Sequence, residues 1–127
     1  MTEQCWVLLG AYDEKDGIWH LRVRRHVSGK PASVEADWRW ALDREEEVGD
    51  VAGFAHTHPA GSGTEPSERD VRTMEAWCSA FGKALVCLIA EGETLKKPAA
   101  YLFSENSRDP LPVADFELSE DEEPTND

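Results

Sequence analysis

The sequence predicts an α/β domain in which helices flank a mixed β-sheet. Two observations support this class: short apolar runs typical of strands, and two longer segments with helical periodicity. Strands are expected at residues 5–12, 18–27, 50–58, 83–90 and 99–103, and helices at residues 35–47 and 67–81. Strands interspersed with helices bury their apolar faces by packing the helices against a sheet.

Boundary signals support both predicted helices. The helix at residues 35–47 is expected to end near Gly49, because glycine readily adopts the left-handed conformation that follows a helix. The helix at residues 67–81 begins with Ser67, a strong N-cap residue, and is followed by Gly82. With Ser67 as the N-cap, Asp70 falls at the third position of the second helix, where the cap would orient its side chain.

The strand at residues 50–58 ends in two histidines. Residues two apart on a strand point to the same face, so His56 and His58 can reach one ion while Thr57 faces away. Asp70 falls in the first turn of the second predicted helix and supplies a carboxylate. Two imidazoles and one carboxylate leave a fourth tetrahedral position open, which distinguishes a catalytic zinc site from a structural one.

This pattern resembles the signature of the JAMM (MPN+) zinc metalloproteases, which release ubiquitin or ubiquitin-like proteins by isopeptide cleavage. That signature contains an upstream Glu, then His-Ser/Thr-His-Pro, then Ser-x-x-Asp, and residues 56–59 and 67–70 match its last two parts. The resemblance implies that the zinc ligands are His56, His58 and Asp70. It also implies that Ser67 helps to stabilise the oxyanion.

One departure from the signature concerns the loop between His58 and Ser67. The family usually has seven residues there, and this chain has eight. Gly61 and Gly63 can absorb the extra residue, because glycine tolerates backbone conformations closed to other residues. The resemblance covers roughly residues 3–103 and implies a cytidine deaminase-like JAB/MPN fold, again a mixed sheet flanked by helices.

The resemblance also implies a general base at Glu3. The family's upstream Glu opens a strand that reads Glu-x-Cys-Gly-x-Leu-Leu-Gly. The present chain matches it at Glu3, Cys5, Leu8, Leu9 and Gly10, and departs from it at Trp6. Only two residues precede Glu3, and side chains so close to a terminus are commonly solvated. Glu35, which also lies upstream of the histidines, is therefore the alternative base.

Charge and length bound the class of protein. A chain of 127 residues is expected to form one domain, here residues 1–113, and residues 114–127 are expected to form a disordered acidic tail. Residues 115–127 hold seven acidic side chains and no Lys or Arg. The net charge of -13 argues against nucleic acid as a partner, because the acidic surface repels phosphate.

The sequence also indicates a cytoplasmic protein. It has no apolar run long enough to span a membrane, and its N-terminus lacks the basic-then-apolar pattern of a signal peptide. Cys5, Cys78 and Cys87 each lie in an apolar segment, so they are expected to be buried thiols in a reducing compartment rather than a second zinc site.

The predicted function is zinc-dependent hydrolysis of the bond after the C-terminus of a ubiquitin-like protein, in deconjugation or in precursor processing. Expected partners are the ubiquitin-like protein or its conjugates and E1-like or E2-like enzymes of the same pathway. The alternative is a non-catalytic scaffold or binding module of the same fold, although such members characteristically lack the ligand set. A zinc deaminase fits less well, because its His-x-Glu and Pro-Cys-x-x-Cys ligands are absent.

Overall fold

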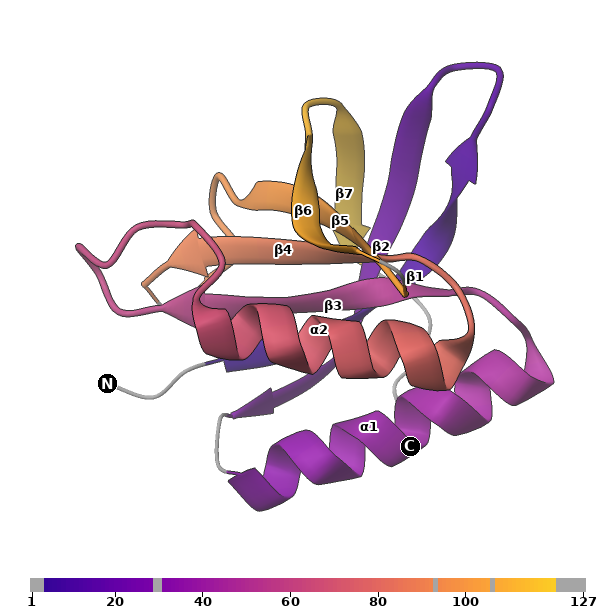
Figure 1. Cartoon of the computed structure of the whole chain (residues 1–127), viewed down its shortest axis with the longest axis horizontal. Helices are drawn as coiled ribbons and strands as arrows, with labels where there is room; N and C mark the ends of the chain where they lie inside the picture. Colours follow the sequence, from indigo (N-terminus) through magenta and orange to yellow (C-terminus); the bar gives the residue numbers. More distant parts are fainter. Residues whose placement is uncertain (1–3, 29–30, 93, 106, 121–127) are drawn as a thin grey trace.

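The computed structural model describes residues 4–28, 31–92, 94–105 and 107–120 (Figure 1). Its elements in chain order are β1 (Gln4–Asp13), β2 (Ile18–Ser28), α1 (Pro31–Glu47), β3 (Val51–His58), α2 (Glu68–Phe81), β4 (Leu85–Glu91), β5 (Ala99–Ser104), β6 (Ser107–Val113) and β7 (Phe116–Glu120). Helix α1 begins earlier than expected, at Pro31, because the missing N–H of proline costs nothing in the first turn of a helix.

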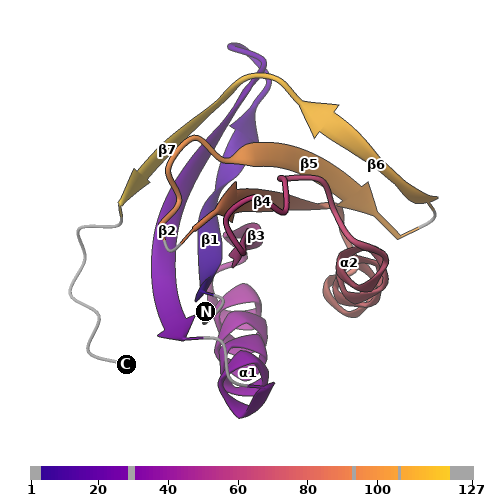
Figure 2. The same ribbon diagram turned by 90° about the vertical axis from the view of Figure 1, so that its left-hand side faces the viewer.

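The described strands form one mixed sheet in the order β6-β5-β4-β3-β1-β2-β7. The pairs β3–β4 and β2–β7 are parallel, and the other neighbours run antiparallel. Figure 2 shows that the sheet is strongly curled and that α1 and α2 lie on the same side of it. The predicted α/β class, a mixed sheet with flanking helices, is confirmed.

Apolar side chains pack on both faces of the sheet. On the helix side, Val7 and Ile89 of the sheet pack in one cluster with Ala41 of α1 and Met74 of α2. The opposite face forms a second cluster of strand residues, to which β6 and β7 contribute partly buried side chains. None of the described helices combines the length and apolar character needed to cross a membrane.

Strands β3 and β4 lie in the middle of the sheet and are covered on both faces. Residues 51–55 and 85–90 are buried throughout, which explains why both strands read as continuous apolar runs. Gly53 allows this pair to approach closely, because a Cβ at that position would collide with the carbonyl oxygen of Val86. The strand that carries the two histidines is therefore held in a fixed register.

Aromatic rings join both helices to β3. Trp38 of α1 stacks on Trp77 of α2 with a centroid separation of 5.2 Å, and Phe54 of β3 lies 3.9 Å from the Trp77 ring centroid. Phe81 packs edge-on against Trp38 at 5.3 Å. Such pairs contribute about 0.5–1.5 kcal/mol each beyond the burial of their area. They fix the position of α2 relative to the histidine strand.

Part of the segment expected to be a disordered tail forms a strand. Residues 116–120, placed in the disordered tail by their charge, form β7 and pair in parallel with β2. Phe116 and Leu118 are partly buried and pack on the sheet, whereas Glu117 between them is exposed. A count of charges hides this period-two alternation, so the boundary at residue 114 is wrong for β7. Residues 121–127 lie outside the described residues.

Strand β6 was also absent from the prediction. It contains Pro110 and Pro112, which discourage a strand assignment because proline cannot donate to a ladder of hydrogen bonds. The strand lies at the edge of the sheet, where one side of the backbone needs no partner strand. Its edge position therefore tolerates both prolines.

Asp50 connects α1, β2 and the start of β3. Arg44 donates two hydrogen bonds of 2.8 Å to its carboxylate, and Arg22 lies 3.2 Å from one of the same oxygens. Gly10 N also donates to the Asp50 carbonyl oxygen at 2.8 Å. The hydrogen bonds from Arg44 lower the pKa of Asp50; burial works against them, and the charges of Arg44 and Arg22 add to the lowering.

We expect Asp50→Asn to lower the free energy of unfolding at pH 7 by about 1–2 kcal/mol, because two charge-assisted hydrogen bonds weaken. The folded-state pKa of Asp50 lies below its ordinary 3.8, so this stabilisation is present above pH 3.8 and is lost as the pH falls through the lower value. Urea denaturation of both proteins between pH 7 and pH 2.5 tests this, with exposed Asp43→Asn as the control. If the difference in free energy of unfolding between the unmodified protein and Asp50→Asn does not decrease as the pH falls, the prediction is wrong.

Removal of residues 115–127 should lower the free energy of unfolding by at least about 2 kcal/mol, since two partly buried apolar side chains and a strand pairing are lost. Removal of residues 121–127 alone is the matched control and should have a much smaller effect. Denaturant titrations of the two truncated proteins make the comparison. Equal stability of both proteins would show that β7 contributes nothing.

Candidate metal centre

Strand β3 presents His56 and His58 on one face of the sheet, as predicted. Thr57 between them is fully buried on the other face, where its hydroxyl oxygen accepts a hydrogen bond of 2.9 Å from the Gln4 backbone N–H. This bond ties the start of β1 to the end of β3. Because side chains alternate along the strand, the contact between Thr57 and Gln4 lies on the face of the sheet opposite the two imidazoles.

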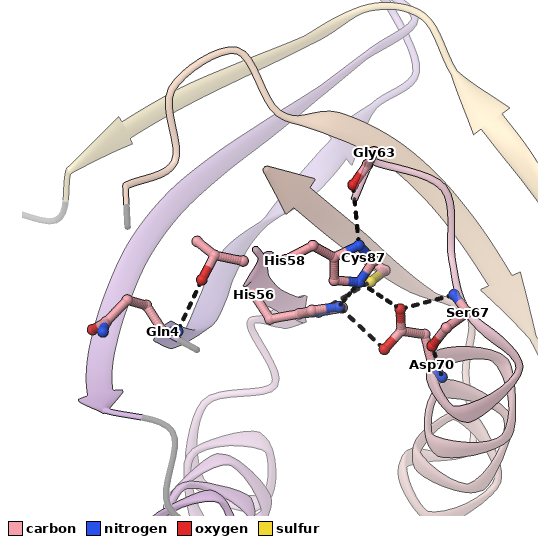
Figure 3. A network of polar contacts seen from close by, with 8 residues as sticks. Gln4, His56, His58, Gly63, Ser67, Asp70 and Cys87 are labelled. Carbon is pink, nitrogen blue, oxygen red and sulfur yellow. Dashed lines mark hydrogen bonds and ion pairs between the residues drawn. The ribbon is translucent and has the colours of Figure 1, made fainter. Parts of the chain in front are cut away.

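Helix α2 presents Asp70 through a complete capping box. The Asp70 N–H donates to Ser67 Oγ at 3.1 Å, and the Ser67 N–H donates to Asp70 Oδ2 at 2.9 Å. The carboxylate therefore both caps the helix and faces the histidines (Figure 3). We call His56, His58 and Asp70 the metal group, because these three residues could hold a metal ion. The two bonds fix the rotamer of Asp70, so Ser67 orients one member of this group.

Side-chain donor atoms of three residues converge at the centre of the site. His56 Nε2 and His58 Nε2 are 3.2 Å apart, and Asp70 places Oδ1 3.1 Å from the first and Oδ2 3.0 Å from the second. Ligands of a tetrahedral zinc ion with bonds of 2.0–2.1 Å lie about 3.3 Å from one another. The spacing and the two-nitrogen, one-carboxylate set both fit zinc, and this group could hold a metal ion.

The ring orientation of His58 is set by the loop that follows it. Its Nδ1 lies 3.1 Å from the carbonyl oxygen of Gly63, and because a carbonyl can only accept, Nδ1 must carry the hydrogen. In the neutral ring, Nε2 then presents its lone pair to the donor group. His56 Nδ1 has a weaker neighbour, the Cys87 sulfur at 4.0 Å.

The electrostatics of the site favour an ionised Asp70 and a neutral Cys87. Burial works to raise the pKa of Asp70, but the His56 hydrogen bond and charge and the Ser67 backbone N–H outweigh it, so the pKa lies well below its ordinary value. Burial raises the pKa of the Cys87 thiol, and the charge of Asp70 adds to this. The carboxylate is thus available as a ligand at neutral pH.

A cavity of about 660 Å³ opens over the donor group. Its walls come from the start of β1, the end of β3, the loop after β3 and helix α2. Trp77 and Met74 contribute apolar surface, and the exposed side chains of Glu65 and Arg69 stand at its rim. The three candidate ligands are therefore accessible from solvent and are walled on several sides.

A larger hollow of about 1360 Å³ lies along the β1–β2 hairpin, and neither His56 nor His58 lines it. Asp13 and His20 line it, and together with Asp16 they form a second group whose donor atoms also lie within 4.8 Å of one another. These side chains are more exposed, and His20 Nδ1 is already 2.9 Å from a carboxylate oxygen of Glu117. The convergent donors of β3 and α2 are the better metal group.

The structure brings together His56, His58, Ser67 and Asp70 of the predicted site. Glu3 lies outside the described residues, as does the side chain of Glu35, whose backbone is in α1. Sequence reasoning missed the contacts of Gly63 and Cys87 with the two imidazoles. Only the pairing of β3 with β4 could have indicated the contact between Cys87 and His56, because these two residues are far apart in the chain.

The chain matches the family model described as prokaryotic homologs of the JAB domain over residues 1–108. It belongs to this family. The curled sheet of seven described strands with two helices agrees with the JAB/MPN α/β fold, so the fold implied by the resemblance is confirmed. A comparison with curated proteins found no significant match.

We expect this member of the prokaryotic JAB (Prok-JAB) family to bind close to one zinc ion per chain. Each of the substitutions His56→Ala, His58→Ala and Asp70→Ala should abolish stoichiometric binding. Removal of one of three protein ligands leaves too few donors to retain the ion. Elemental analysis after zinc reconstitution and desalting measures the content. His20→Ala, in the second group, is the matched control and should retain zinc; loss in the control with retention in the others would reverse the assignment.

Proposed function

We propose that this Prok-JAB protein is a zinc-dependent peptidase that hydrolyses the bond after the C-terminus of a ubiquitin-like protein. The observation that carries the proposal is the convergence of His56, His58 and Asp70 donor atoms within 3.0–3.2 Å of one another beneath an open cavity. A scaffold has no need for three convergent, partly buried ligands beside a substrate-sized cavity.

Hydrolysis of an amide requires a better nucleophile than water and a more reactive carbonyl. When bound, zinc supplies Lewis acidity, which serves both needs near neutral pH. The ligand side chains orient that chemistry: the His58 ring is held by Gly63, and the Asp70 carboxylate is held by the capping box. Little reorganisation of the protein is then needed when a substrate binds.

We assign the general base to Glu3. Gln4 and Cys5, the residues next to it that the structure describes, line the cavity, and Cys5 pairs across the sheet with His56. The carboxylate of Glu3 would accept a proton from the attacking water and deliver it to the leaving amine, which is a lysine ε-amine in an isopeptide. This role rests on the family resemblance together with the position of β1.

Ser67 is suited to stabilise the oxyanion. Its Oγ accepts from the Asp70 N–H, which leaves the hydroxyl hydrogen able to donate, and its exposed side chain lies at the cavity. A preorganised donor of this kind contributes a few kcal/mol to catalysis in comparable sites. Ser67 is not a nucleophile in this scheme, because both nearby imidazoles face the metal group rather than the serine.

A cysteine-protease mechanism is disfavoured although Cys87 lies 4.0 Å from an imidazole. The Cys87 side chain is fully buried, and burial raises its pKa, so the thiolate does not form near neutral pH. A substrate carbonyl could not reach the sulfur without opening the sheet. Hydrolysis by activated water is the mechanism that the donor set supports.

The proposed substrates are ubiquitin-like proteins, as precursors or as conjugates, and the proposed partners are E1-like or E2-like enzymes of the same pathway. This choice of substrate rests on the resemblance to JAMM metalloproteases, and the open cavity beside the ligands supports it. The net charge of -13 further favours a substrate with a basic surface.

Glu3→Gln should keep bound zinc and lower turnover by a factor of about 100 or more, because the amide cannot accept a proton. The assay uses ubiquitin-like proteins carrying a C-terminal peptide or an isopeptide-linked lysine, with zinc content measured in parallel. Glu35→Gln is the control and should retain activity. An active Glu3→Gln with an inactive Glu35→Gln would move the base to Glu35; no turnover by the zinc-loaded protein on either substrate type would favour a scaffold.

Ser67→Ala should lower kcat by a factor of about 10–100 with a smaller change in KM, since an oxyanion donor acts mainly in the transition state. Ser67→Thr retains both the hydroxyl and the N-cap and should restore most of the activity. Steady-state kinetics of the two variants at equal zinc loading separate catalysis from helix capping. Equal losses in both variants would argue that Ser67 acts only through the shape of the site.

A further inference from the structure

The loop between β3 and α2, residues 59–66, is held by a carboxylate from another strand. Glu91 Oε2 accepts hydrogen bonds from Gly61 N at 2.6 Å and from Gly63 N at 3.1 Å. Within the loop, Ser62 N donates to the Pro59 carbonyl oxygen at 3.0 Å. We call residues 59–66 the site loop. Its middle is thus fastened to the end of β4.

Parallel pairing of β3 and β4 places Glu91 where the site loop returns. His58 and Glu91 are Cα partners at the last paired position, and Gly92 N donates to the His58 carbonyl oxygen at 2.9 Å. The chain leaves β3 directly after His58 and folds back over this end of the sheet. A long acidic side chain at the end of β4 therefore meets the backbone of the loop.

The two glycines of the site loop are required by conformation rather than by space. Gly61 and Gly63 have φ values of 88° and 84°, and a Cβ at either position would meet nothing within 4 Å. These left-handed conformations, which other residues rarely adopt, turn both N–H groups toward one carboxylate oxygen. The loop is built to receive an anionic side chain.

Gly63 joins this anchor to the metal group. Its N–H donates to Glu91. Its carbonyl oxygen accepts a hydrogen bond of 3.1 Å from His58 Nδ1 (Figure 3). The next residue is fastened as well, because the Tyr101 hydroxyl of β5 donates to the Thr64 carbonyl oxygen at 3.1 Å. Two neighbouring strands thus fix the peptide that orients the His58 ring.

We propose that Glu91 is a positioning residue for the metal centre: by holding the site loop, it keeps the Gly63 carbonyl where His58 Nδ1 donates and His58 Nε2 faces the other ligands. The inference deepens the proposed function, since it assumes that this group binds zinc. Glu91 is exposed and its bonds link only the loop to a strand end, so global stability depends little on it.

Glu91→Ala should weaken zinc binding about 5–10-fold, somewhat less than the 10–100-fold typical of groups that contact a ligand directly, because Glu91 acts one residue further away. Glu91→Gln keeps an acceptor oxygen for the two N–H groups and should stay within about 2-fold of the unmodified protein. Dissociation constants come from competition with a chromophoric chelator. The matched control is Glu105→Ala, which removes an exposed carboxylate at the end of β5.

The pair of Glu91 variants separates loop anchoring from simple charge. Equal weakening in Glu91→Gln and Glu91→Ala would attribute the effect to the lost negative charge and overturn the proposal, as would unchanged affinity in Glu91→Ala. Visible absorption of the cobalt-substituted proteins should shift in Glu91→Ala and not in Glu91→Gln, because it reports the geometry of the ligands. If Glu91→Ala does not fold, Tyr101→Phe removes the second anchor and must weaken zinc binding for the proposal to stand.

These measurements need no substrate, so the two hypotheses can fail separately. Zinc binding that depends on Glu91 in a protein without peptidase activity would overturn the proposed function and support the positioning role. Peptidase activity with zinc affinity independent of Glu91 and Tyr101 would do the reverse. An unmodified protein that binds no zinc would overturn both.

Discussion

The parallel pairing of β3 with β4 is the constraint on which the rest of the structure depends. Both strands are buried on both faces, and Gly53 lets their backbones approach without collision. This pairing delivers His56 and His58 to one end of the sheet and sets Cys87 and Glu91 beside them. A one-residue slip would turn the two imidazoles to the opposite face, so the core that holds the register also holds the chemistry.

Helix α2 completes the metal group through local and tertiary interactions together. The capping box orients the Asp70 carboxylate, and the rings of Trp38, Phe54 and Trp77 fix the helix against β3. Asp70 is consequently an acceptor for backbone and imidazole groups at the same time, which keeps its pKa low despite burial. Contacts within the protein thus hold the carboxylate in place beside the two imidazoles.

The edges of the sheet show how composition can mislead. In β7, apolar Phe116 and Leu118 alternate with polar residues, and their contribution to the sheet is hidden within a segment whose average charge predicts disorder. In β6, two prolines suggest a loop, yet the edge position accommodates them. Both errors arise because the average composition of a segment does not record which face or edge of the sheet each residue occupies.

The sequence by itself determined the α/β class, the histidine strand, the capped helix and the three residues of the candidate metal group, because strand alternation and helix capping act over a few residues. Only the tertiary structure decided that the donor atoms of His56, His58 and Asp70 lie 3.0–3.2 Å apart, and that Glu91 reaches Gly61 and Gly63. These contacts join residues from different elements through the order of strands in the sheet. Strand order follows from how buried surfaces match over the whole chain, which no local pattern records.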